Sequence, residues 1–344
     1  MNCTDQYLQQ VHNVSTVFYI LLQVIQTVLC VLAPFMFSFL DRKYTSVYIH
    51  ANTRTLIVFF RITSALYCLS FSSIEMYHIG SRFVLQDCDL LVADRWCIWF
   101  RIVQSWATVV FQFFFIAVVL EILLRQLLTC LDNTRIVACI LGCSVYLIGF
   151  HAVYRSVPID LESDGYLSNC ASLEHKNKEK LGAIFIWYLC LDTCSLSCLI
   201  FLRYYIKWNF SKSRMKFEIN KKVKRTELWR AYCLMLPNAI LHVTCFLYIS
   251  LSSMFVFSKF ETTNNPQIDY LLTNAIPLYV FVSPIAWCVV LRREMQKVAV
   301  RNPEHERDMY FDELAKQWGD KKETNSLQRR SSRRVRPETK SIDP

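Results

Sequence analysis

Seven long apolar stretches constrain this chain more than any other feature of its sequence. A helix that crosses a lipid bilayer needs about 20 mainly apolar residues, and seven segments reach that length. They are Val17–Leu40, Thr55–Tyr77, Ile98–Leu123, Ile136–Val153, Leu181–Tyr204, Ala231–Phe257 and Ile268–Leu291. The sequence therefore predicts an all-α membrane protein, folded as a seven-transmembrane helix bundle.

The composition favours a membrane protein over an enzyme. Only 19% of the 344 residues are charged, whereas about a quarter are charged in a typical soluble domain. The chain has six glycines and lacks the G-x-x-x-x-G-K-[ST], G-x-G-x-x-G, G-x-S-x-G and H-E-x-x-H patterns that mark phosphate, nucleophile and zinc sites. We expect no enzymatic activity, no cofactor and no metal site.

The loop charges predict the orientation of the bundle, because lysine and arginine gather in cytoplasmic loops. The connection between the fifth and sixth spans, "RYYIKWNFSKSRMKFEINKKVKRTELWR", carries ten basic residues and two glutamates. We therefore expect residues 1–16 outside, the bundle over 17–291, and a cytoplasmic tail over 292–344. The net charge of +10 then favours membrane lipids, not nucleic acid, as a partner. Asn2 and Asn13 begin glycosylation sequons in the outer N-terminus.

Most of the fifteen cysteines lie within spans, where cysteine packs as a small apolar residue. Cys190, Cys194 and Cys198 recur every four residues in the fifth span, and Cys139 and Cys143 do so in the fourth. This spacing puts each set on one helix face, and we expect both sets to pack against neighbouring helices.

The remaining cysteines on the outer side can form a disulfide, since that compartment is oxidising. Cys97 opens the third span and Cys170 lies in the second outer loop, so their bridge would tie that loop over the bundle. Cys88–Cys97 and Cys88–Cys170 remain as alternatives, and Cys3 is also on this side.

Polar residues inside the spans are the candidates for a ligand site. Gln104 and Gln112 lie eight residues apart on nearly one face of the third span. Asp192 lies near the middle of the fifth span, where an acid is a functional hypothesis by default; the alternative is a structural carboxylate paired with another helix. The ligand-binding candidates are Gln104, Trp106, Tyr188, Asp192 and Glu75.

Other polar residues and prolines have structural interpretations. Arg61 in the second span could pair with Glu121 at the inner end of the third. Pro237, Pro277 and Pro284 should kink their helices. His242, deep in the sixth span, is interpreted as a packing donor.

Several short motifs are similar to those of nematode serpentine chemoreceptors. "YIHANTRTLIVFF" resembles the "H-x-N-x-[KR]-x-L-[LI]" start of the second span in the Sra superfamily, which includes the Sra, Srab, Srb and Sre families. "DCDLLVADRWC" resembles that group's first outer loop, "FVSPIAW" its seventh span and "ERDMYFDELAKQW" its tail. The resemblance implies a G-protein-coupled receptor in the plasma membrane of a sensory cell.

The sequence also departs from the receptor pattern. The group often carries Glu-Arg-x-x-Ala-Thr at the inner end of the third span, whereas this chain reads "LEILLRQLLT". Glu121 keeps the acid, Ile122 stands in place of arginine, and Arg125 follows three residues later. Coupling to a heterotrimeric G protein is thus implied by the resemblance, with Glu121, Arg125 and Arg61 as candidate switch residues.

The tail predicts contact with the inner leaflet. Leu291, Met295 and Val298 follow helical spacing among basic residues, as in a short amphipathic helix. The segment "RRSSRRVRPETK" is predicted to be disordered, with Ser331 and Ser332 as candidate phosphorylation sites.

These features together favour a chemosensory receptor that binds a small molecule from outside and signals to a G protein. Two alternatives stay open. A seven-span ligand-gated channel of the insect odorant-receptor kind would have its N-terminus inside, and a membrane transporter would show repeated spans or a layer of His, Asp and Glu residues.

Overall fold

The computed structural model describes residues 15–44, 51–85, 90, 92–127, 135–156, 166–167, 170, 178–212, 219–259, 271–272 and 274–300. The chain divides into two compact units, Met1–Leu291 and Arg292–Pro344. The sites expected at Asn2, Asn13, Ser331 and Ser332 lie outside the described residues.

The described part of the chain is almost entirely helical. Its helices are α2 (Val17–Tyr44), α3 (Ala51–Val84), α4 (Asp94–Leu127), α5 (Ile136–Ser156), α6 (Lys178–Lys212), α7 (Ile219–Lys259) and α9 (Ile276–Val300). Two short strands, β1 (Val92–Ala93) and β2 (Tyr166–Leu167), pair antiparallel. The predicted all-α class is confirmed.

Six of these helices are long and apolar enough to cross a bilayer. Their apolar segments are Val17–Leu40, Ala51–Val84, Arg95–Leu124, Ile136–Arg155, Met235–Phe255 and Ile276–Arg293. The protein is therefore a multi-pass membrane protein. The remaining predicted segment, Leu181–Tyr204, lies within α6.

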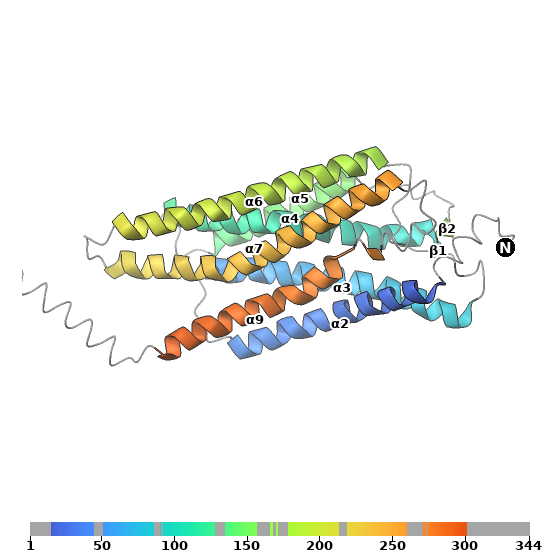
Figure 1. Cartoon of the computed structure of the whole chain (residues 1–344), viewed down its shortest axis with the longest axis horizontal. Helices are drawn as coiled ribbons and strands as arrows, with labels where there is room; N and C mark the ends of the chain where they lie inside the picture. The colour runs from blue at the N-terminus through green and yellow to red at the C-terminus, as the bar shows by residue number, and fades with distance from the viewer. Residues whose placement is uncertain are drawn as a thin grey trace, which may run out of the picture. The chain divides into compact units, whose positions relative to one another are not determined.

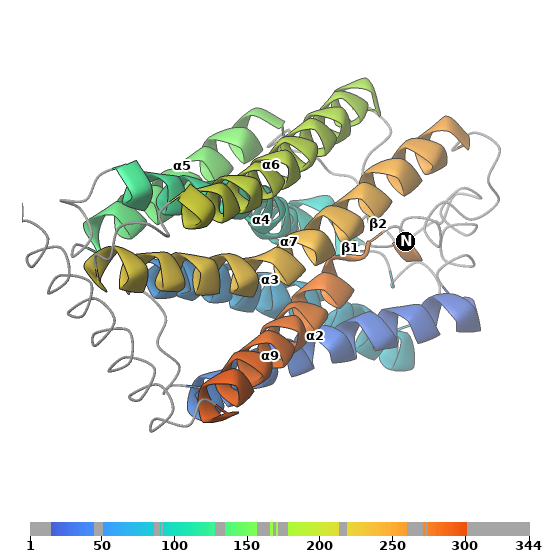
Figure 2. The same cartoon turned by 60° about the vertical axis from the view of Figure 1, so that its left-hand side comes forward.

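The helices of the first unit pack in three groups. α2 and α9 lie on one side, α5 and α6 on the other, and α3, α4 and α7 between them (Figures 1 and 2). α2 packs along α3, α4 along α5, and α6 along α7. Polar residues that face the centre of this arrangement are thus placed at the meeting of several helices.

The outer surface of the bundle is apolar, as a lipid-facing surface must be. Leu147 is 69% exposed and Phe201 65%. Exposed tryptophan and tyrosine residues lie near the ends of the helices, where amphipathic rings meet the membrane–water interface; examples are Trp96, Trp99, Tyr154, Trp187, Tyr204 and Trp208.

The two cysteine sets differ from the sequence expectation. Cys139 and Cys143 of α5 and Cys190, Cys194 and Cys198 of α6 are all exposed. The equal spacing puts each set on one helix face, as predicted. That face points away from the helices described, because other faces of α5 and α6 supply the contacts between helices. The expected packing of these cysteines between the described helices is therefore wrong.

The seventh predicted segment is divided, and its first proline has a different role. Asn274 and Ala275 are not helical, and α9 begins at Ile276. Pro277 is therefore in the first turn, where its missing N–H costs no hydrogen bond and its fixed φ suits the helix. The expected kink at Pro277 is wrong, whereas Pro237 and Pro284 do lie inside α7 and α9.

An aromatic core holds the central helices together. The ring of Phe60 on α3 lies 5.3 Å from Phe111 of α4 and from Trp287 of α9, and 6.1 Å from Phe37 of α2 and from Tyr279 of α9. Such pairs add about 0.5–1.5 kcal/mol each beyond the area they bury. This core surrounds the polar groups described next.

Candidate functional site

A buried acid and a buried histidine meet in the middle of the bundle. Asp192 of α6 and His242 of α7 lie 3.1 Å apart, Oδ1 to Nε2, with 2% and 1% of their side chains exposed. Because Nε2 faces a carboxylate, we assign the ring proton to that nitrogen, which then donates a hydrogen bond to Asp192. The contact links α6 to α7 with a charge-assisted hydrogen bond.

Gln112 of α4 joins this pair. With its amide nitrogen turned toward Asp192, it donates to the two carboxylate oxygens at 2.5 and 3.3 Å. Gln112 is 1% exposed. The three residues, Gln112, Asp192 and His242, form the core polar network, which connects three helices through one carboxylate.

Aromatic rings enclose the core polar network. The His242 ring lies 4.4 Å from Phe246, 4.6 Å from Phe115 and 5.4 Å from Tyr279. Apolar surroundings lower the local dielectric, so both the attraction within the network and the cost of breaking it are larger than in water. A rearrangement of α6 against α7 would have to part these groups.

A second polar contact joins α7 to α9 beside their prolines. With its amide oriented to suit its neighbours, Asn238 donates to the Ser283 hydroxyl at 2.9 Å and accepts from the Trp287 indole N–H. Asn238 and Ser283 are fully buried. Asn238 directly follows Pro237, and Ser283 directly precedes Pro284. The contact therefore bridges the two positions where the helices lose a backbone hydrogen bond.

A second buried acid lies between α2 and α3. Gln23 of α2 donates its side-chain N–H to Glu75 of α3, and neither residue has any exposed surface. One turn further along α2, Gln26 donates to the backbone oxygens of Leu271 (2.8 Å) and Asn274 (3.2 Å). Gln26 thereby satisfies carbonyls at the break before α9.

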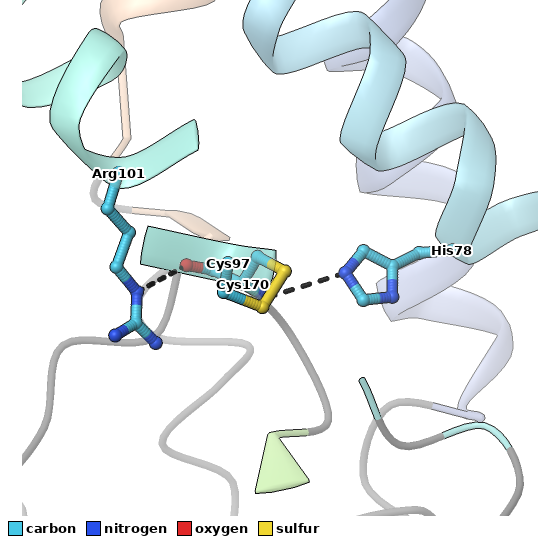
Figure 3. Close-up of a disulfide and its surroundings, with 4 residues drawn as sticks. All are labelled: His78, Cys97, Arg101 and Cys170. Carbon is cyan, nitrogen blue, oxygen red and sulfur yellow. Dashed lines mark hydrogen bonds between the residues drawn. A yellow bond between two sulfur atoms is a disulfide. The ribbon is translucent and has the colours of Figure 1, made fainter. Parts of the chain in front are cut away.

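The disulfide joins the start of α4 to the segment that follows β2. Cys97 is bonded to Cys170, the pair that the sequence analysis preferred. Figure 3 shows the bridge between two further side chains: Arg101 donates to the Cys170 carbonyl at 2.7 Å, and the Cys170 N–H donates to Nε2 of His78 at 3.4 Å. The loop is thus attached to both α3 and α4, and this end of the bundle is called the disulfide end below.

Glu121 and Arg61, which the sequence suggested as an ion pair, each have another contact. The Thr53 hydroxyl lies 3.5 Å from a Glu121 carboxylate oxygen. The Arg61 guanidinium lies 5.8 Å from the Phe37 ring, in a cation–π arrangement. Arg125 is on α4, but its side chain lies outside the described part of the chain.

The remaining ligand candidates occupy different places. Trp106 is buried between α4 and α5, where its indole N–H donates to the Tyr146 carbonyl at 3.3 Å. Gln104 is half-buried on α4. The Tyr188 side chain is outside the described residues. The candidates whose side chains are described therefore do not form one site: Asp192 and Glu75 lie in separate polar clusters, and Trp106 serves helix packing.

Sequence reasoning did not single out Gln23, Gln26 or Asn238. Two glutamines three residues apart in an otherwise apolar span are a detectable signal, since such residues almost always face the bundle interior. Asn238, directly after a proline, is a similar signal. His242 was interpreted only as a packing donor, because its partner lies 50 residues away in the chain.

No protein-family model matches the chain, and comparison with curated proteins finds no relative.

Proposed function

We propose that this protein is a seven-span chemosensory receptor that binds a small molecule and signals to a heterotrimeric G protein. Its N-terminus is outside and its tail is cytoplasmic, in the plasma membrane of a sensory cell. The sequence motifs similar to nematode serpentine chemoreceptors support this proposal, as do the basic connection between α6 and α7 and the two sequons.

The core polar network is the observation that carries the proposal. An ionisable residue within a membrane bundle is costly, and where it occurs it is a functional hypothesis by default. Here one carboxylate holds three helices, α4, α6 and α7, and α7 carries Pro237 within its span. A ligand that favours another packing of these helices would act through its differential affinity for the two packings.

Basal G-protein activation tests the signalling part without a known ligand. The full-length chain is expressed at matched surface levels as wild type and as Asp192→Asn, and dissociation of each class of Gα from Gβγ is recorded by energy-transfer sensors. Asp192→Asn weakens the hold on His242, so we expect its basal signal for at least one Gα class to differ two-fold or more from wild type. Thr193→Ala, an exposed position on the same helix, should match wild type.

A conductance in place of a G-protein signal would reverse the conclusion. If every Gα class is silent in both proteins while surface-expressing cells carry a new ion current, the channel alternative holds.

Topology is tested separately. Tags at the N-terminus and in the tail are read by antibody on intact and permeabilised cells. We expect the N-terminal tag to be visible on intact cells and the tail only after permeabilisation. A hidden N-terminus on cells with confirmed surface delivery would contradict the receptor orientation.

A further inference from the structure

We propose that the interface of α2 and α3 near the disulfide end binds a protonated primary amine through Gln23, Gln26 and Glu75. The proposal deepens the receptor function by naming the chemistry of a ligand, and its biological meaning rests on that function. Binding itself is tested without any signal.

Three buried oxygen atoms at this interface lack a hydrogen-bond donor. They are Oε1 of Gln23, Oε1 of Gln26 and Oε1 of Glu75, none of which has a partner among the described residues. Gln23 and Glu75 are 0% exposed. Leaving a buried acceptor unsatisfied is costly, so this combination points to a donor that belongs there.

The three oxygens come from neighbouring side chains. The side-chain N–H of Gln23 donates to one oxygen of Glu75. Oε1 of Gln23 and Oε1 of Glu75 therefore belong to two side chains that contact each other. Gln26 lies three residues after Gln23, and residues at this spacing are neighbours on one helix face. The amide of Gln26 is held in place by the carbonyls of Leu271 and Asn274.

The acid at the interface favours a cationic ligand. Glu75 is the acid of the group, and it forms no ion pair within the described part of the chain. Arg82, seven residues further on the same helix, interacts electrostatically with Glu75 but forms no ion pair with it. Its guanidinium lies over the Tyr19 ring, 5.3 Å from the centroid.

An ammonium group fits this set better than other cations. It carries three N–H donors and no acceptor, which matches three acceptor oxygens and one negative charge. A quaternary ammonium has the same charge but no N–H, and it would leave all three oxygens without donors.

The neighbours of the site connect binding to helix packing. Tyr19 and Leu271, both 0% exposed, pack together between Gln23 and the start of α2. The Leu271 carbonyl also accepts the hydrogen bond from Gln26, so an amine bound to Gln26 would act on this pair. Binding would thus alter the contact of α2 with the segment before α9.

Thermal unfolding of the purified full-length protein in lipid nanodiscs tests the proposal. The probes are ethylammonium, tetramethylammonium and sodium chlorides, at equal ionic strength up to 50 mM. We expect ethylammonium to raise Tm by about 2–4 °C in a saturable manner, while the other two salts leave Tm unchanged. No change in Tm with ethylammonium would overturn the proposal. Equal changes in Tm with tetramethylammonium or sodium would show that N–H donors are not required, and would overturn the assignment of a primary amine.

Two acid variants locate the site. Glu75→Gln should lose the ethylammonium shift, whereas Asp192→Asn, at the buried acid of the core polar network, should keep it. The opposite result would place the amine at the core polar network and refute this assignment. If Glu75→Gln cannot be purified, Gln26→Leu replaces it, with at least a three-fold weaker apparent affinity expected and an unchanged affinity counting against the site.

Failure of this proposal is distinguishable from failure of the receptor function. The binding experiment contains no G protein, and the basal signalling experiment contains no amine, so each can fail while the other succeeds.

Discussion

Asp192 of α6 and His242 of α7 lie 3.1 Å apart, Oδ1 to Nε2, in the centre of the bundle. Both side chains are almost fully buried. This contact, extended by Gln112, makes the packing of α4, α6 and α7 depend on one carboxylate. Its removal should therefore affect stability as well as signalling.

Asp192→Ala should destabilise the protein. The substitution leaves the His242 N–H and the Gln112 amide buried without an acceptor, at a cost of about 1–3 kcal/mol. We expect a Tm lower by several degrees in thermal unfolding of the purified protein. Thr193→Ala, exposed on the same helix, is the matched control, and equal Tm values for the two variants would show that the network contributes little.

The contact of Asn238 with Ser283 should be measurable as a coupling energy. Hydrogen bonds between membrane helices average about 0.6 kcal/mol and reach about 1.7 kcal/mol. In a double-mutant cycle of Asn238→Ala and Ser283→Ala, the second substitution should cost less than it does alone. Strictly additive losses would mean that the two side chains do not stabilise each other.

Loss of the disulfide should lower stability, and either cysteine alone should account for the loss. The bridge spans a separation of 73 residues, for which chain entropy gives an upper value of about 4 kcal/mol. Cys97→Ser, Cys170→Ser and the double variant should share the same reduced Tm. Cys88→Ser should resemble wild type; a drop as large as that of Cys97→Ser would favour one of the rival pairings.

Two glycines of α5 should not tolerate a methyl group. A Cβ at Gly149 would lie 2.9 Å from Val110 and 3.0 Å from Trp106, and one at Gly142 would lie 2.7 Å from the Phe59 ring. Overpacking of this kind costs about 1–3 kcal/mol, so Gly149→Ala and Gly142→Ala should each lower Tm.

Gly80 of α3 is the control for these variants. Nothing lies within 4 Å of a Cβ at this position, and alanine is the better helix former by about 1 kcal/mol. Gly80→Ala should leave Tm unchanged or raise it. A decrease equal to that of Gly149→Ala would remove the packing explanation.

The sequence by itself determined the class of the fold and the approximate position of each apolar helix. Bilayer length and local composition are properties of consecutive residues, so Val17–Leu40 and Ile136–Val153 could be located without knowing any contact. The same local information predicted that Asp192 would be inside a span, and that the cysteines of α5 and α6 would share helix faces.

Only the tertiary structure decided what those residues contact, because the partners are far apart in sequence. Asp192 could have met any neighbouring helix, and the fold brings it to His242 and Gln112. Glu75 meets Gln23, 52 residues before it. The cysteines face outward because helical spacing defines a face but not the direction in which it points. Local composition sets which segments enter the membrane, whereas packing among all the helices sets which side of each is buried.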